Sequence, residues 1–211
     1  PKAIEDLSAL IQLMPQSYLN YYSRAQLWLK LKSFDKAIED LNTVQAMLPD
    51  EPWVWIDRAE IWLYKKDRSK ALSDLNRALE LSVGNNERYT GEVHTHLAWF
   101  YAIQQDFKQA ETELALASAL DAQNPSFLLI HGLIAYLQGH REQALQSLTQ
   151  LRSRIQASEV FAEWLDNHQA VLWQNRSLSE AQKQQGQELL NRAKDNDLKA
   201  LEAFFQWLLV L

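Results

Sequence analysis

Small and hydrophobic residues recur along this chain with a spacing of 34 positions. The hexapeptide Lys-Ala-Ile-Glu-Asp-Leu occurs at 2–7 and again, unchanged, at 36–41. The alanine of this hexapeptide recurs at positions 71, 110 and 144, and the longer step between positions 71 and 110 indicates an insertion of five. A period of this length is typical of stacked helical hairpins, in which neighbouring units bury apolar faces that no single unit could bury alone.

A second series of small residues precedes the alanines at 37, 71, 110 and 144 by 12 positions: Ala25, Ala59, Ala98 and Gly132. Three positions further on, the residues are Trp28, Trp62, Tyr101 and then Ala135, which breaks the aromatic series. Each unit is therefore predicted to contain two helices joined by a turn. We expect the small side chains where the two helix backbones approach most closely, with bulky side chains around them. Gly139 is the conformationally permissive residue expected in the fourth turn.

These positions resemble the tetratricopeptide repeat family. The matched residues are Tyr21, Trp55, Ala25, Ala59, Ala98, Gly132, Trp28, Trp62, Tyr101, Phe34, Phe107, Ala37, Ala71, Ala110, Ala144 and Pro49. The resemblance implies an all-α, right-handed superhelical solenoid of helix-turn-helix hairpins with a degenerate C-terminal helical cap. It places a half repeat at 1–17 and full repeats at 18–51, 52–85, 91–124 and 125–158. The family's usual leucine-glycine pair is replaced here by Arg24-Ala25, Arg58-Ala59, Leu97-Ala98 and His131-Gly132.

Residues 159–211 are predicted to form a degenerate hairpin followed by a hydrophobic tail helix, within the same solenoid. The first helix spans Glu159–Trp173, and Ser177-Leu178-Ser179-Glu180 has the spacing of a capping box that starts the second. The tail should bury the side chains of Leu201, Phe204, Phe205, Trp207 and Leu208. We expect it to pack on the last hairpin, enter the concave groove, pair with another copy, or continue into a further domain.

The first helices of such stacked hairpins line the concave side and form the candidate binding groove. The stripe expected to face it is Tyr22, Gln26, Leu29, Ile56, Glu60, Leu63, Thr95, Trp99, Ala102, Leu129, Leu133 and Tyr136, with Trp53 at the edge. This surface is apolar and aromatic, with Glu60 as its main charge, and suits an amphipathic helix or an extended hydrophobic segment of a partner protein. The alternative is that part of the stripe is core, covered by neighbouring helices or by the chain's own tail.

A second mode of peptide binding is not expected in this groove. Some relatives hold a C-terminal carboxylate with lysine, asparagine and arginine from the same stripe. The corresponding positions here include Tyr22, Gln26, Asp57, Glu92 and His96. Residues 84–90 form the one irregular stretch of the array, which we interpret as a surface insertion or as a contact loop using Arg88 and Tyr89.

Composition and motifs point away from several other functions. A formal net charge of −6 argues against nucleic acid as the main ligand. The absence of cysteine rules out disulfides and thiolate metal sites. His94 and His96 lie two positions apart, on different faces of a helix, and His131 is expected to be a packing residue. The sequence contains no run of 18 apolar residues and no catalytic or phosphate-binding motif, so we expect neither a membrane span nor an enzyme, metal or cofactor.

These features favour a protein–protein interaction scaffold that takes part in the assembly of a complex. The chain opens with Pro1 in the middle of a repeat, which suggests a fragment or processed product, so cytoplasm and periplasm both stay open. Its glutamine-rich, cysteine-free composition leans towards a bacterial protein. The alternatives are a regulatory or targeting arm of a larger enzyme, or a self-associating module that forms a homodimer through the C-terminal helix.

Overall fold

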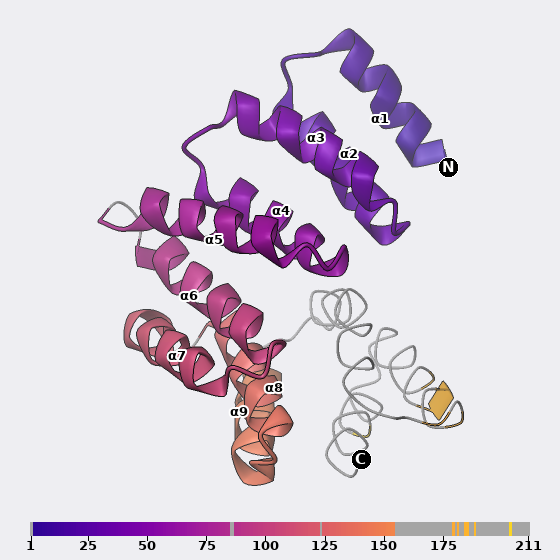
Figure 1. Ribbon diagram of the computed structural model, residues 1–211. Coiled ribbons are helices and arrows are strands. Elements are labelled where there is room, and N and C mark those ends of the chain that lie inside the picture. Colours follow the sequence, from indigo (N-terminus) through magenta and orange to yellow (C-terminus); the bar gives the residue numbers. More distant parts are fainter. Residues whose placement is uncertain are drawn as a thin grey trace. The chain divides into compact units, whose positions relative to one another are not determined.

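The computed structural model describes residues 2–84, 87–122 and 124–154, together with positions 179, 181, 184, 185, 188 and 203. The predicted C-terminal hairpin and tail helix, with Leu201, Phe204, Phe205, Trp207 and Leu208, lie outside the described residues. The described ranges contain α1 (Lys2–Leu13), α2 (Tyr18–Lys30), α3 (Phe34–Met47), α4 (Pro52–Tyr64), α5 (Arg68–Ser82), α6 (Glu87–Ala102), α7 (Phe107–Asp121), α8 (Pro125–Leu137) and α9 (Arg141–Arg154) (Figure 1). Two compact units, Pro1–Phe100 and Tyr101–Leu211, divide the chain.

Helix starts follow local chemistry that the sequence makes visible. Pro52 occupies the first turn of α4, where its missing N–H costs nothing. The side chains of Asp67 and Asp106 cap α5 and α7 by accepting the backbone N–H groups of Lys70 and Gln109, each at 3.2 Å. Each cap satisfies one of the backbone N–H groups in the first turn of its helix that have no partner within the helix.

The turns inside the hairpins share one backbone conformation, with a residue in the left-handed region. Lys32, Lys66, Gln105 and Gly139 all have positive φ, between 55° and 83°. The next residue in each turn returns its N–H to a carbonyl five positions back, as in Ser33 to Trp28 at 2.8 Å. The sequence pattern indicated this conformation only for Gly139. Three non-glycine residues adopt it because the turn geometry is repeated with the period of the chain.

The small residues of both series are buried in the four full repeats, as the period predicted, whereas Ala3 of the half repeat is exposed. Ala25, Ala37, Ala59, Ala71, Ala98, Ala110 and Ala144 are each at most 2% exposed. Within the N-terminal unit, α2 packs on α3 and α4 on α5, and α8 packs on α9 in the second unit. A larger side chain at any of these crossings would force the helices apart, at a cost of about 1–3 kcal/mol.

The segment predicted as an irregular loop at 84–90 is a loop only in part. α6 begins at Glu87, so Arg88, Tyr89 and Thr90 are helical, which corrects the loop interpretation for these residues. α6 has 16 residues, against 13 in each of α2, α4 and α8. Part of the insertion therefore lengthens the first helix of the third unit by about a turn.

Candidate functional site

The predicted groove residues fall into two groups by exposure. Six side chains from α2 and α4 are half-buried and form what we call the first-helix face: Tyr22, Gln26, Leu29, Trp53, Glu60 and Leu63. A second group is buried, each at most 4% exposed: Ile56, Thr95, Trp99, Ala102, Leu129 and Leu133. The side chain of Tyr136 lies outside what the structure describes.

Burial corrects the prediction that the second group faces an open groove. Trp99 and Leu133 are among the largest fully buried side chains. The alternative weighed from the sequence, that part of the stripe is core, holds for these six positions. Spacing identifies which residues share a helix face, but it does not tell whether another element covers that face.

Aromatic rings join α2 to the first turn of α4 on the first-helix face. The Tyr22 and Trp53 rings meet edge to face with their centroids 5.0 Å apart, and Tyr18 lies 6.4 Å from the same indole. Beside them, Gln26 Nε2 donates to Asp57 Oδ2 at 3.5 Å, and the Tyr22 hydroxyl also hydrogen-bonds to Asp57. Aromatic pairs of this geometry contribute about 0.5–1.5 kcal/mol beyond their buried area, so this part of the face is preorganised.

Three carboxyl groups, those of Asp57, Glu60 and Glu92, interact in this region and oppose one another's ionisation, which its apolar pattern did not predict. Burial, together with repulsion from Glu60 and Glu92, raises the pKa of Asp57 to about 7, although the Tyr22 hydrogen bond opposes the shift. Burial also raises the pKa of Glu92; Arg88 opposes this rise and Glu60 adds to it. Glu60 accepts a hydrogen bond from the Tyr64 hydroxyl at 3.0 Å. The region therefore favours cationic or proton-donating groups.

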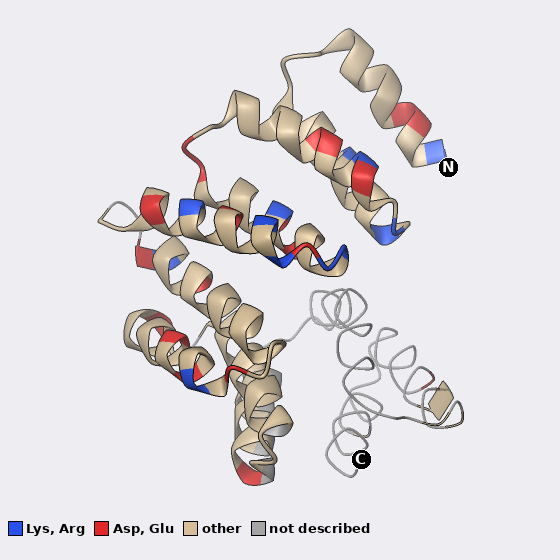
Figure 2. Cartoon of the chain, in the orientation of Figure 1, with Lys and Arg blue, Asp and Glu red and all other residues tan. Residues whose placement is uncertain are grey.

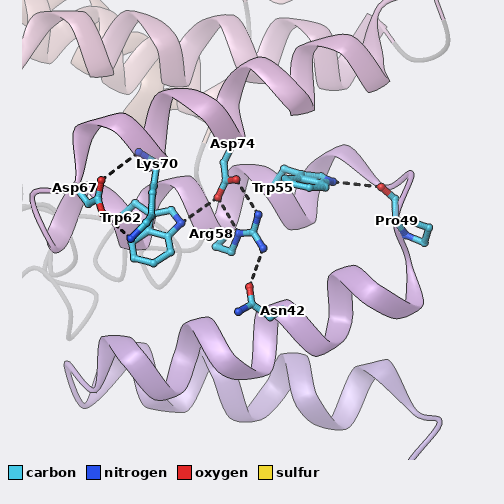
Figure 3. Close-up of polar contacts among 8 residues, drawn as sticks. All are labelled: Asn42, Pro49, Trp55, Arg58, Trp62, Asp67, Lys70 and Asp74. Carbon is cyan, nitrogen blue, oxygen red and sulfur yellow. Dashed lines mark hydrogen bonds and ion pairs between the residues drawn. The ribbon is translucent and has the colours of Figure 1, made fainter.

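Two ion pairs join the helices inside the first two hairpins, and the sequence pattern did not reveal them. Arg24 donates two hydrogen bonds to the Asp40 carboxylate, from Nε at 2.9 Å and from Nη2 at 2.7 Å. Figure 3 shows the equivalent pair, in which Arg58 Nε and Nη2 donate to Asp74 at 2.8 Å each. The aspartates are 4% and 5% exposed. The available signal was arginine in place of the family's leucine, with an aspartate at the matching position of the second helix in both units.

Each arginine also reaches back to the preceding hairpin or helix. Arg58 Nη1 donates to Asn42 Oδ1 on α3 at 2.7 Å, and Arg24 Nη1 donates to Ser8 Oγ on α1 at 2.9 Å. One guanidinium therefore connects three helices. The hydrogen bond to the aspartate raises the pKa of Arg24, against the opposing effect of burial.

Lysine–tryptophan contacts repeat with the same period. Lys36 Nζ lies 4.3 Å from the Trp28 ring centroid, and Lys70 Nζ lies 4.3 Å from that of Trp62. In the second hairpin, Trp62 Nε1 also donates to Asp74 Oδ2 at 3.1 Å (Figure 3). The two hairpins thus share one sequence pattern at their helix contact: a first helix with Arg-Ala-x-x-Trp packs on a second helix with Lys-Ala-x-x-Asp-Leu.

The position equivalent to these arginines carries a neutral contact in the fourth hairpin. His131 Nδ1 lies 2.6 Å from Ser147 Oγ, and its ring stacks on Phe127 at 5.6 Å. Burial lowers the pKa of His131. This is the satisfied packing histidine that the sequence predicted. Among the described residues no group of acidic or histidine side chains could hold a metal ion, and none of the described helices is long and apolar enough to cross a bilayer.

Solved structures show the class of the fold. A chain of the Cut9-Hcn1 hetero-tetramer of the APC/C matches with a TM-score of 0.65 at 17% identity, over 96% of this chain and 38% of its own. PilW, a type IV pilus biogenesis factor, matches with a TM-score of 0.57 at 17% identity, over 78% of this chain and 75% of its own. A tetratricopeptide repeat protein from Parabacteroides merdae matches with a TM-score of 0.53 at 14% identity, over 97% and 90%.

These similarities confirm an all-α helical-repeat solenoid of the tetratricopeptide type. Within that class, the chain belongs to the family described as "Domain of unknown function (DUF7017)", whose model matches residues 17–126. The matched segment contains both Arg–Asp pairs and the first-helix face. A sequence comparison with curated proteins finds no match.

Proposed function

We propose that this chain is a non-catalytic scaffold that binds a segment of a partner protein along the first-helix face. The observation that supports this best is the Tyr22–Trp53 ring pair, half-buried beside Gln26 and Asp57. Stacked helical repeats use extended surfaces of this kind to bind other proteins. The face offers rigid aromatic area, which binds at low cost in conformational entropy.

The charge of the face narrows the chemistry of the partner. Glu60 lies on the first-helix face, and it interacts electrostatically with the carboxyl groups of Asp57 and Glu92. A hydrophobic helix or extended segment that also carries a lysine or arginine would satisfy both the rings and the carboxylates. An acidic segment would be repelled.

A role in complex assembly is part of this proposal. Two proteins of similar fold carry such roles in their descriptions: PilW as a pilus biogenesis factor, and the Cut9-Hcn1 hetero-tetramer as an assembly in itself. Their low identity to this chain means that these descriptions support the kind of task and do not identify a partner.

The decisive experiment compares two variants with the same change of charge. Gln26→Lys with Glu60→Lys adds three positive charges to the first-helix face. Glu39→Lys with Gln45→Lys adds the same charge to α3, a second helix. Tagged wild-type protein is used to capture partners from a lysate, and the strongest is purified. Its affinity for all three proteins is then measured by calorimetry.

We expect the face variant to bind the purified partner at least about tenfold more weakly, since like charges across an interface cost several kcal/mol. The α3 variant should bind as the wild type does. Equal affinity in both variants would move the binding surface away from the first helices, and a loss confined to the α3 variant would assign it to the second helices.

A further inference from the structure

The region around the first-helix face is aromatic on one side and acidic on the other, and Tyr22 belongs to both sides. The Tyr22 ring meets Trp53 edge to face at 5.0 Å, where α2 borders α4. Its hydroxyl hydrogen-bonds to Asp57, one turn further along α4. Glu60 follows on the same helix, and Glu92 acts on Asp57 from α6. A segment that crosses the first helices from α2 towards α6 therefore meets aromatic rings first and carboxyl groups next.

Within the described part of the chain, Asp57 has no cation that balances its charge. Burial, Glu60 and Glu92 raise its pKa, and the hydrogen bond that opposes them comes from the neutral Tyr22 hydroxyl. Asp57 in turn raises the pKa of Tyr89 on α6. A carboxylate in such surroundings is costly. With a pKa of about 7, the group is therefore divided between its acid and ionised forms near neutral pH.

The positive charges on the helices around Asp57 are directed to other groups. The lysines of α3 and α5, Lys36 and Lys70, lie over tryptophan rings. The arginines of α2, α4 and α6 all act on other carboxyl groups: Arg24 on Asp40, Arg58 on Asp74 (Figure 3) and Arg88 on Glu92. Because Asp57 is only half-buried, a bound molecule can reach it and supply the missing cation.

The same contacts narrow the chemistry of that cation. A metal ion does not fit, since among the described residues no group of acidic or histidine side chains is arranged to hold one. A lysine or arginine side chain fits, because its apolar stem can pack on the Tyr22–Trp53 ring pair while its charge meets Asp57. Gln26 Nε2, at 3.5 Å, and the Tyr22 hydroxyl hold the carboxyl group in place. An opposite charge favours the ionised form, so cation binding and proton release are linked.

Resting on the function proposed above, we propose that the partner segment carries a lysine or arginine that binds Asp57, and that this binding requires Asp57 to lose its proton. The acid form of Asp57 gives its proton to the solvent when the cation binds. An apolar residue beside the cation packs on the Tyr22–Trp53 ring pair. The segment is therefore held at pH 8 and released towards pH 6.

The probe is a phage-displayed library of short random peptides, selected on the immobilised full chain at pH 8. Selected peptides are kept when Trp53→Ala weakens their binding, which marks the first-helix face without a bias for charge. We expect the kept peptides to carry lysine or arginine next to apolar residues. The same selection on Asp57→Asn should keep the apolar residues and return fewer basic ones.

One kept peptide is then labelled, and its affinity for the full chain is measured by fluorescence anisotropy from pH 6 to pH 8. Over this range the ionised fraction of Asp57, whose pKa is about 7, rises from about one tenth to about nine tenths. Because the ionised form is the one that pairs with a cation, the wild type should bind about tenfold more tightly at pH 8. Asp57→Asn should bind weakly, with the same affinity at both ends of the range.

Two control variants separate this effect from other charges. Asp6→Asn makes the same change at an exposed residue of α1, outside the first-helix face, and should keep the full pH dependence. His96→Gln removes a residue of α6 that also changes charge in this range, and should keep it too. Calorimetry at pH 7 in buffers of different protonation enthalpy should show release of about half a proton per bound peptide in the wild type and none in Asp57→Asn.

An equal affinity at pH 6 and pH 8, or a pH dependence that Asp57→Asn keeps, would overturn the proposal. A dependence that is lost in His96→Gln would assign the proton to that histidine instead. In each of these cases peptides still bind the first-helix face, so the proposed function stands. If no selected peptide depends on Trp53, the proposed function itself fails, and this inference fails with it.

Discussion

The hairpins α4–α5 and α8–α9 share their geometry and differ in what holds their helices together. Each has a first helix of 13 residues and a small residue at the crossing, Ala71 in one and Ala144 in the other, with no exposed surface. In α4–α5 the link is the buried Arg58–Asp74 ion pair. In α8–α9 the equivalent link is the neutral His131–Ser147 contact, and α8 carries no charged residue (Figure 2).

The comparison shows that the repeat period specifies the crossing and leaves the polarity around it free. α8 compensates for its missing ion pair with buried apolar side chains: Phe127, Leu128, Leu129, Ile130, Leu133, Ile134 and Ala135. A buried ion pair contributes little net stability relative to apolar packing, but it is costly to break on one side only. The two hairpins should therefore respond differently to single substitutions and to pH.

The largest expected effect comes from removing one partner of the ion pair. Arg58→Ala leaves the Asp74 carboxylate buried without its cation and should lower the free energy of unfolding by about 3–5 kcal/mol. Hydrogen exchange across Pro52–Ser82 would measure the loss. Arg77→Ala, which removes an exposed partner of Glu80 on the same helix pair, is the control and should cost less than about 1 kcal/mol. A small loss in Arg58→Ala would mean that Asp74 reaches water.

The next largest expected effect is a pH dependence of the free energy of unfolding that comes from Asp57 in α4. Asp57 has an ordinary pKa of 3.8 and a pKa of about 7 in the folded chain. The folded state thus binds the proton more tightly, so stability should fall as pH rises from about 4 to about 7 and stay level above. Relative to Asp57→Asn, we expect a decline of about 2–4 kcal/mol over this window. Denaturant titrations of both proteins at several pH values would measure it, and parallel curves would contradict it.

Sequence reasoning predicted where the helices cross but did not predict the ion pair beside the crossing. The alanine series correctly located the helix crossings, because close approach of two backbones admits only small side chains. The Arg58–Asp74 pair was missed, since both residues are common on solvated helix faces and their contact depends on how two separate helices pair in three dimensions. The family departure at Arg58 was visible, but its physical reason appears only with Asp74 beside it.

The candidate site was predicted less completely than the fold. Periodicity placed Tyr22 and Glu60 on the first-helix face, and both are half-buried there. It also placed Trp99 and Leu133 on an open surface, and both are buried. A stripe that faces away from its own hairpin can still be covered by another element, and no local pattern records that. Binding at the first-helix face stays a prediction.

A smaller effect of opposite sign is expected from α8. Burial lowers the pKa of His131 below its ordinary value of 6.5, so the unfolded chain binds this proton more tightly. The stability of α8–α9 should therefore fall as pH drops through about 6.5, where the Asp57 contribution is still rising. His131→Leu, which copies the residue at the equivalent position 97, should remove this dependence. Hydrogen exchange in Pro125–Arg154 at pH 7.5 and pH 5.5 would measure it, and an unchanged slope in the variant would contradict it.

The smallest effect concerns the turns of the same two hairpins, where Lys66 and Gly139 occupy equivalent positions with φ of 60° and 83°. Because this left-handed conformation strains a residue with a Cβ, Lys66→Gly should stabilise α4–α5 by about 0.5–1 kcal/mol. Gly139→Ala should destabilise α8–α9 by a similar amount, and purely through the backbone, since an added Cβ would meet no atom within 4 Å. Thermal unfolding of both variants checks the pair. Two changes of the same sign would show that side-chain contacts, and not φ, decide these turns.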